Sequence, residues 1–211
     1  DVAMYSAGGA YAGTEKQQIC LSYAYGDGKE SSCENTVNSV QRLFYNIPIN
    51  TYFSLDLDGI AALNDSIGGV DVVSPETIGD FVEGQSYHLV GQQAESFVRT
   101  RDTSKVDSNN MRMQRQKVYI QSFMNTVIQQ TKKDLTTPLD LFNASAPYSC
   151  TNLNPSKVTY LAQQAVLGGM NGIDMLSVPG QVKMGSKYAE FNVSEAEFYQ
   201  MFLSIYYTKI E

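Results

Sequence analysis

Arginine residues are concentrated in one short stretch of the chain. The sequence holds Arg42 near its start, and its other arginines are Arg99, Arg101, Arg112 and Arg115. A guanidinium group presents a planar fork of donors that matches phosphate oxygens two at a time, and it keeps its charge at any physiological pH. In a chain whose net charge is -7, such a local concentration predicts a site for a phosphate-bearing anion.

The spacing of these residues predicts how they face the anion. Arg112, Arg115 and Gln116 stand at i, i+3 and i+4, so on a helix they point to one side. They lie in the first turns of an expected helix, where free N–H groups and the helix dipole favour an anion. Arg99 and Arg101 alternate in an expected extended segment and so face one way. The whole set is typical of a site for two linked phosphates.

Two other interpretations of this segment stay open. The arginines can instead form ion pairs on a solvated face with the acidic residues Asp80, Glu95, Asp102 and Asp107. The expected helix also carries an apolar stripe that follows Arg112 and Gln116 and contains Ile120, Phe123 and Val127. A charged end above an apolar stripe suits a polyprenyl pyrophosphate, but such a stripe is more often the core face of its helix.

Short strand patterns alternate with helical ones, which predicts an α/β fold with a central mixed β-sheet flanked by helices. The expected strands lie at 2–5, 10–12, 51–57, 70–73, 86–90, 173–178 and 188–191, and the expected helices at 33–45, 58–67, 91–98, 110–133, 139–143, 156–167 and 195–207. Ser31 with Glu34 is expected to cap the first of these helices, and Ser194 with Glu197 the last. We see no linker or repeat and expect a single domain over residues 1–211.

Composition narrows the class of function. The acidic balance opposes nucleic acid as a partner, because binding the phosphate backbone needs a broad basic surface. No apolar run reaches the roughly 18 residues of a membrane span, and no signal peptide is recognisable. His88 is the one histidine, so a zinc site or a Ser-His-Asp triad would have to use it. Its extended apolar surroundings favour a structural or surface role.

The three cysteines, Cys20, Cys33 and Cys150, show no metal-binding spacing. They are either small buried hydrophobic residues or, outside the cytoplasm, a source of disulfides. In the second case we expect a bridge between Cys20 and Cys33, with Cys150 free. The loop-entropy model gives such a bridge about 3 kcal/mol.

An ordered set of motifs resembles the LytR-CpsA-Psr family from about Gln17 to Thr131. The set comprises Tyr23-Ala24-Tyr25-Gly26, the D-x-x-G-G-V-x-V signature at 65–72, L-x-G-x-x-A at 89–94, R-x-R at 99–101 and R-x-x-R-Q at 112–116. Each motif alone is weak, but their order and spacing are specific. Two positions depart from the family pattern. Asn109 stands where an acidic residue usually precedes R-x-x-R-Q, and Gln18 stands where a lysine is usual.

The resemblance implies an extracytoplasmic enzyme of a Gram-positive bacterium. Such enzymes move a glycopolymer phosphate from a polyprenyl-pyrophosphate carrier to a peptidoglycan hydroxyl. It places substrate contacts at Arg99, Arg101 and Arg112 with Gln116 beside them, and Arg115 also fits the motif. Arg99 and Arg101 would neutralise the pyrophosphate during transfer. Asp107, or else Asp102, would take the proton of the attacking hydroxyl.

The resemblance also implies an upstream segment that supplies a membrane anchor, the first strands of the sheet, a further arginine and the aspartates that hold Mg²⁺. We therefore expect an incomplete sheet and no metal ligands in this chain. Two functions from other classes stay open. One is a non-catalytic module that binds polyprenyl pyrophosphate or cell-wall glycan. The other is a transcriptional regulator, which the lack of a basic helix-turn-helix opposes.

Overall fold

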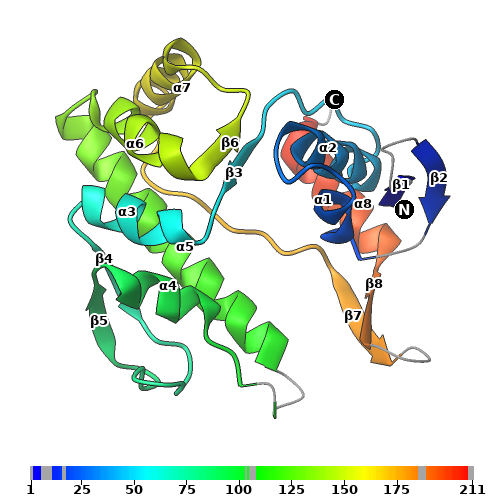
Figure 1. The fold of residues 1–211 in the computed structure, drawn as a ribbon, viewed down its shortest axis with the longest axis horizontal. Helices are drawn as coiled ribbons and strands as arrows, with labels where there is room; N and C mark the ends of the chain where they lie inside the picture. The colour runs from blue at the N-terminus through cyan, green and yellow to red at the C-terminus, as the bar shows by residue number, and fades with distance from the viewer. Residues whose placement is uncertain are drawn as a thin grey trace. The chain divides into compact units, whose positions relative to one another are not determined.

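The computed structural model describes residues 2–5, 11–15, 18–102, 104, 108–184 and 189–208 (Figure 1). The chain divides into two compact units, Asp1–Asp174 and Met175–Glu211. The single domain over residues 1–211 stays a prediction.

The first unit holds most of the secondary structure. In chain order its elements are β1 (Val2–Tyr5), β2 (Tyr11–Glu15), α1 (Leu21–Ala24), α2 (Glu30–Leu43), β3 (Phe53–Leu55), α3 (Asp58–Ser66), β4 (Val70–Val73), β5 (Ser86–Leu89), α4 (Gln92–Arg99), α5 (Ser108–Lys133), α6 (Thr137–Ser145), the 3-10 helix η1 (Ala146–Tyr148), β6 (Ser149–Thr151) and α7 (Pro155–Leu167). The second unit contains β7 (Gly180–Met184), β8 (Ala189–Val193) and α8 (Glu195–Tyr206). Within the described residues, no helix combines the length and the apolar character needed to cross a membrane.

The predicted α/β class is confirmed, but its predicted central mixed sheet is wrong for the described strands. They form two-stranded antiparallel ladders that pair β1 with β2, β3 with β6, β4 with β5 and β7 with β8. The reason is visible in β4, where Val70 and Val72 are buried while Asp71 and Val73 are exposed. Burial of one face suits an antiparallel pair, whereas a central strand of a parallel sheet is covered on both faces.

Most predicted elements are present with small shifts at their ends. β4 occupies the predicted residues, and α4, α5 and α7 begin within two residues of their predicted starts. The strand expected at 173–178 is wrong, because residues 171–179 have no regular structure and the boundary between the two units falls after Asp174. Ser194 directly precedes α8 as predicted, but its side chain makes no capping bond.

The capping box predicted for α2 is also wrong, because the helix begins at Glu30. Asp27 takes the capping role, since its Oδ1 accepts hydrogen bonds from the backbone N–H of Lys29 at 2.7 Å and of Ser32 at 3.4 Å. These bonds favour the ionised carboxylate and lower the pKa of Asp27.

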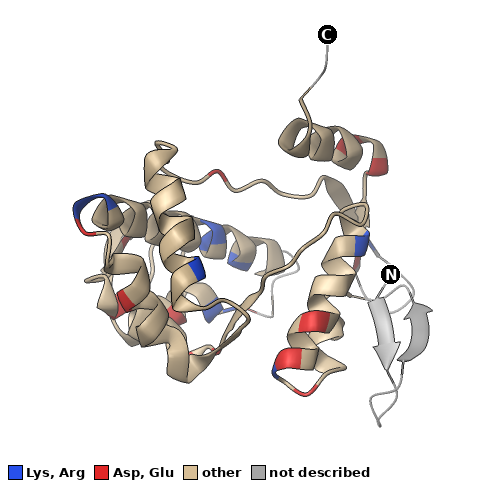
Figure 2. Ribbon diagram, turned by 90° about the horizontal axis from the view of Figure 1, so that it is seen from above, with Lys and Arg blue, Asp and Glu red and all other residues tan. Residues whose placement is uncertain are grey.

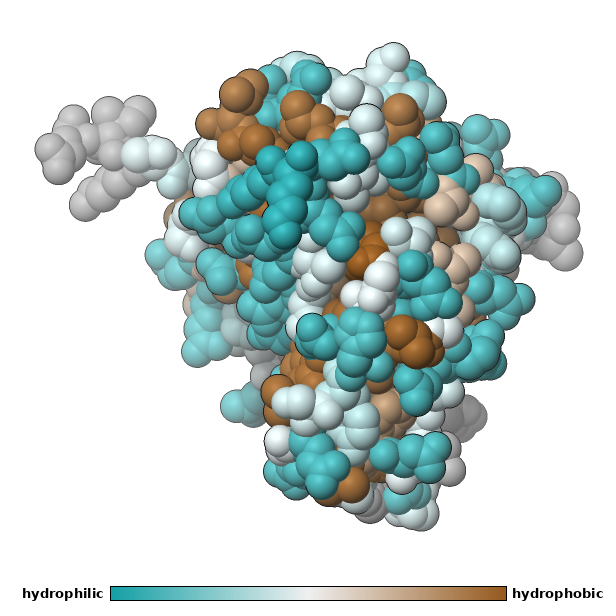
Figure 3. Space-filling view, turned by 90° about the vertical axis from the view of Figure 1, so that its left-hand side faces the viewer, coloured by the Kyte–Doolittle hydropathy of each residue, from teal (hydrophilic) through white to brown (hydrophobic). Residues whose placement is uncertain are grey.

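The main hydrophobic core holds α4 against α5 and the β4–β5 hairpin. Its buried members are Ile67, Val70, Val72, Phe81, Leu89, Ala94, Phe97, Val98, Tyr119 and Leu141. Phe97 is fully buried and meets Phe81 edge to face, with ring centroids 5.0 Å apart. By contrast α7 has no buried residue, and its Leu161 and Leu167 are exposed. On one face of the molecule, Figure 3 shows hydrophobic groups in brown scattered among hydrophilic ones. Because the buried hydrophobic residues gather around Phe97 and none belongs to α7, the packing that positions α4 and α5 lies around Phe97.

A buried amide adds a polar link to this core. The Asn64 side chain in α3 donates to the Leu89 carbonyl at 2.8 Å, and its oxygen accepts from the Tyr119 hydroxyl at 3.2 Å. Burial raises the pKa of Tyr119, so its hydroxyl stays a neutral donor. Because buried amides and hydroxyls must be hydrogen-bonded, the pair fixes α3 and α5 against β5.

The D-x-x-G-G part of the signature motif has a structural explanation. Asp65 accepts from the backbone N–H of Gly91 at 2.6 Å, which anchors the start of α4. Gly69 has a φ of 91°, and a Cβ there would lie 2.6 Å from His88 Nε2 and 2.8 Å from the Leu89 carbonyl oxygen. Both the left-handed backbone and the close approach require glycine at this position.

His88 is exposed, as predicted, and generates a testable pH dependence. Its Nδ1 lies 2.8 Å from Asp71 Oδ1 and its Nε2 lies 3.0 Å from the Gly68 carbonyl. Both partners are acceptors, so both bonds form only with the protonated ring. The hydrogen bond with Asp71 raises the pKa of His88 above its ordinary value of 6.5. The stability it contributes is full below pH 6.5 and is lost as pH rises through the folded-state pKa.

We expect an NMR titration of this one histidine to give a pKa above 6.5 in the wild-type protein. Asp71→Ala should lower that pKa, because the main hydrogen-bond acceptor is gone. An unchanged titration in the variant would show that the pair does not form in solution.

Candidate functional site

The two arginine motifs meet where the end of α4 packs against the start of α5. Three donors from α5 bind carbonyls of the last turn of α4 and of its C-cap. Arg115 Nε donates to the Phe97 carbonyl at 2.8 Å, Arg115 NH2 donates to the Thr100 carbonyl, and Gln116 Nε2 donates to the Val98 carbonyl at 3.2 Å. The last carbonyls of a helix have no partner within it, so these side chains satisfy them.

Arg115 is the most buried charged side chain at this junction, with an exposed fraction of 0%. Its NH1 pairs with Glu76, which lies in the connection between β4 and β5. Burial lowers the pKa of Arg115, the Glu76 carboxylate raises it, and the nearby charge of Arg112 lowers it. Because its guanidinium faces protein groups, Arg115 does not fit its predicted role as a substrate ligand. The structure gives it the role of a support for the R-x-R segment.

Arg99 and Arg101 are exposed at the end of α4. Arg99 forms an ion pair with Glu95 one turn earlier, at 2.7 Å, and 61% of its side chain is exposed. Arg101 donates from Nε to the Ser108 hydroxyl at 3.0 Å, which ties it to the first residue of α5. The Arg101 guanidinium is therefore held near the N-terminal end of α5, whereas that of Arg99 is held by its own helix.

Arg112 is half-buried in the second turn of α5. Its NH2 donates to Asn109 Oδ1 at 2.9 Å. Its Nε is buried without a hydrogen-bond partner among the described residues. Asn109 is the position where the family pattern has an acid, so a neutral amide replaces a carboxylate next to this guanidinium. A buried donor without a partner and a cation without a counter-ion both favour an incoming anion.

α5 carries basic residues and no acidic ones, although the protein as a whole is acidic. Its basic residues are Arg112, Arg115, Lys117, Lys132 and Lys133, and no acidic residue occurs from Ser108 to Lys133 (Figure 2). Arg112, Arg115 and Lys117 are in its first half, close to the free N–H groups of the first turn. The helix thus concentrates positive potential where the arginines of α4 end.

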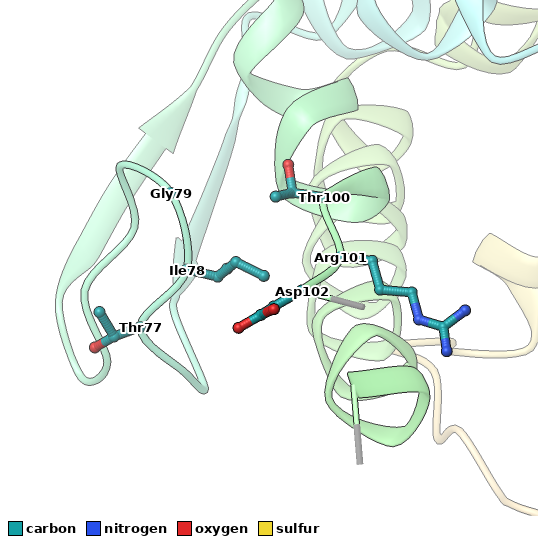
Figure 4. A pocket seen from close by; sticks show the side chains of 6 residues that line it. All are labelled: Thr77, Ile78, Gly79, Thr100, Arg101 and Asp102. Carbon is teal, nitrogen blue, oxygen red and sulfur yellow. The ribbon is translucent and has the colours of Figure 1, made fainter. Parts of the chain in front are cut away.

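A cavity of about 350 Å³ lies beside Arg101. Its lining combines Thr77, Ile78 and Gly79 from the β4–β5 connection with Thr100, Arg101 and Asp102. Figure 4 shows the side chains of Ile78 and Asp102 directed toward each other, whereas Arg101 extends away from them. Arg99, Arg112 and Gln116 do not line this cavity.

A polyprenyl chain would need a cavity lined by apolar residues, whereas the lining of the cavity beside Arg101 is mainly polar. The apolar stripe of α5 has the second of its two predicted roles, as the core face of the helix. Phe123 and Val127 pack against the hydrophobic core, while 42% of Ile120 is exposed. The stripe is therefore mostly the core face of its helix.

Of the two candidate bases, Asp102 and Asp107, the structure describes Asp102. Asp102 faces the cavity, and its Oδ1 accepts from the backbone N–H of Ser104 at 3.1 Å and from the Ser104 hydroxyl at 2.6 Å. Asp107 lies outside the described residues. Asp102 is thus the described carboxylate that is placed to meet a ligand.

The described residues do not fit a magnesium site. They contain no group of three or more histidine, cysteine, aspartate or glutamate side chains that is placed to hold a metal ion. Mg²⁺ remains an expectation from the family resemblance, and no chemical step proposed for this chain depends on it.

Sequence reasoning missed two parts of the site. The first is Glu76, the buried partner of Arg115, for which no local pattern gives a signal. The second is the segment 77–79 that walls the cavity. Its Gly79-Asp80 pair signals a turn, and Ile78 and Phe81 do exchange backbone hydrogen bonds there. Its position opposite Asp102 depends on the tertiary fold.

The burial of Arg115 leads to a stability prediction. Arg115→Met should destabilise the protein by about 3–5 kcal/mol, because it leaves Glu76 as an unpaired carboxylate that is largely buried. Glu76→Gln in addition should recover part of this loss. Arg101→Ala is the matched control and should cost less than about 1 kcal/mol, since that arginine is exposed. Urea denaturation measures all three, and equal losses for Arg115→Met and Arg101→Ala would contradict the supporting role.

Comparison with known proteins agrees with these motifs. The LytR_cpsA_psr family model matches residues 2–204. The chain is 28% identical, over 173 residues, to the polyisoprenyl-teichoic acid–peptidoglycan teichoic acid transferase TagU of Bacillus cereus. That match covers 79% of this chain and 52% of the relative. Matches to the curated relatives span between 28% and 52% of their length.

Solved structures show the same fold. TagU of Bacillus subtilis superposes with a TM-score of 0.63 at 20% identity, covering 100% of this chain and 84% of TagU. TagT bound to LI-WTA gives a TM-score of 0.65 at 16% identity, covering 97% of this chain and 74% of TagT. The family model covers nearly the whole sequence, and the chain belongs to the LytR-CpsA-Psr family.

Proposed function

We propose that this chain carries the pyrophosphate-binding part of an enzyme that attaches an anionic glycopolymer to peptidoglycan. The donor is a glycopolymer on a polyprenyl-pyrophosphate carrier, and the acceptor is a peptidoglycan hydroxyl. The enzyme acts outside the cytoplasmic membrane of a Gram-positive bacterium, and the full-length protein is held there by an N-terminal anchor. The observation that carries the proposal is Arg112, whose buried Nε has no described partner.

The pyrophosphate is bound by cations that lack a carboxylate partner in the described structure. Arg101 is tied only to the Ser108 hydroxyl and Arg112 only to the Asn109 amide. Arg99 adds a third guanidinium, which is exposed and forms an ion pair with Glu95. Gln116 donates from Nε2 to the Val98 carbonyl, which holds its side chain at the same junction. Several guanidinium groups around one anion repel each other until the anion is present, and this favours binding of two linked phosphates.

Transfer requires stabilisation of charge more than covalent catalysis. As the bond between the glycopolymer phosphorus and the bridging oxygen breaks, negative charge builds up on the leaving lipid phosphate. Guanidinium groups that are already in position stabilise this charge without further rearrangement. The acceptor hydroxyl enters the cavity beside Arg101, where Asp102 takes its proton.

This assignment predicts a binding defect without a folding defect. Arg112→Ala should weaken binding of a short-chain polyprenyl pyrophosphate by roughly 10- to 150-fold, which corresponds to about 1.5–3 kcal/mol for a charged hydrogen bond. Arg42→Ala is the matched control, because Arg42 is an exposed arginine at the end of α2, far along the chain from the site. Calorimetric titration measures the affinity, and thermal melting checks the fold.

The outcomes are distinct. If Arg112→Ala binds as tightly as the parent, the arginines form only a solvated face and the proposal fails. If the variant melts well below the parent, Arg112 is structural. A polymer-transfer assay on the full-length protein separates an enzyme from a binding module, since a module would bind the pyrophosphate with no product formed.

A further inference from the structure

Two of the three cysteines are neighbours although more than 100 residues separate them in the sequence. Cys33 lies in α2 with an exposed fraction of 4%. Cys150 is the central residue of β6 and pairs with Ser54 across the β3–β6 ladder. Burial raises the pKa of the Cys33 thiol, the neighbouring Cys150 thiol raises it further, and the Ser54 hydroxyl lowers it. α2 packs against β6, so Cys33 and Cys150 belong to two elements that are in contact.

Cys20 lies in a different environment. It is exposed at the start of α1, and its sulfur is 3.7 Å from Gln18 Oε1. Cys150, and not Cys20, is the cysteine that acts on the pKa of the Cys33 thiol, so the structure does not favour the predicted bridge between Cys20 and Cys33. All three cysteines are free thiols in the structure.

We propose that Cys33 and Cys150 form a disulfide that fastens α2 to the β3–β6 ladder. The proposal rests on the extracytoplasmic location given under the proposed function, because disulfides persist in oxidising compartments. The link closes a loop of more than 100 residues that contains both arginine motifs. Long loops lose the most unfolded-state entropy when they are closed. The ladder it reinforces is short, with three residue pairs.

The Cys33–Cys150 bond forms by thiol–disulfide exchange with the disulfide of an extracytoplasmic oxidoreductase. The more exposed Cys150 attacks that disulfide and forms a mixed disulfide, releasing one thiol of the oxidoreductase. The Cys33 sulfur then displaces the second thiol and completes the bond. The two cysteines lose two protons and two electrons, and the oxidoreductase is reduced to its dithiol. Burial and the neighbouring Cys150 raise the pKa of Cys33 to about 11, so little of it is thiolate and the more exposed Cys150 attacks first.

Peptide mapping tests the pairing directly. Tryptic cleavage after Lys16, Lys29, Arg42, Lys133 and Lys157 places each cysteine in a different peptide. The purified chain is oxidised with glutathione disulfide, alkylated and digested without reduction. We expect a linked pair of peptides, 30–42 with 134–157, and an unlinked peptide 17–29 that carries Cys20. Linkage of 17–29 to 30–42, or free thiols at both Cys33 and Cys150 after oxidation, would overturn the proposal.

Thermal melting of single variants gives a second measurement. Oxidation should raise the Tm of the wild-type protein by roughly 5–15 °C. Cys20→Ser is the matched control and should keep this rise, whereas Cys33→Ser and Cys150→Ser should both lose it. A rise that survives either of the last two contradicts the bridge. Pyrophosphate binding does not use the thiols, so a missing bridge with intact Arg112-dependent binding rejects only this inference.

Discussion

The site depends on one buried charge, the guanidinium of Arg115. A charged group with no exposure to water costs several kcal/mol unless it is paired and fully hydrogen-bonded. Its partners come from two segments, Glu76 after β4 and the Phe97 and Thr100 carbonyls at the end of α4, and Arg115 itself belongs to a third, α5. None of these segments can move away without leaving a buried charge unpaired. The position of the R-x-R segment relative to α5 therefore follows from the burial of a residue that does not face the ligand.

The same contacts solve an electrostatic problem at the end of α4. The C-terminus of a helix carries partial negative charge on its free carbonyls, which would repel the anion that Arg99 and Arg101 are meant to bind. Arg115 and Gln116 donate to the carbonyls of residues 97, 98 and 100 and so compensate that charge. The R-x-x-R-Q motif therefore contains two kinds of residue. Its first arginine faces outward to the junction, and its last two residues make the junction suitable for an anion.

Local patterns predicted the parts of this arrangement that depend on local physics. The strand predicted at 70–73 matches β4, whose one face packs on the core, and the helix predicted at 110–133 from its apolar positions covers most of the 26-residue α5. The pattern could not separate Arg115 from Arg112, since both lie on one broad side of the helix. Arg115 shares the buried side with Tyr119, one turn on, and its partner Glu76 is 39 positions away. The strand expected at 173–178 failed for a related reason, because a strand needs a partner that its own sequence does not specify.

The arginines share the same chemistry but differ in whether a carboxylate compensates their charge. Glu76 compensates Arg115 and Glu95 compensates Arg99, so these two guanidinium groups already have carboxylate partners. Among the described residues, Arg101 and Arg112 are bound only by a hydroxyl and an amide. These neutral partners orient the guanidinium groups and leave their charge available. The Asn109 amide thus accepts a hydrogen bond from Arg112 without adding a negative charge beside it, which supports the anion site proposed for this junction.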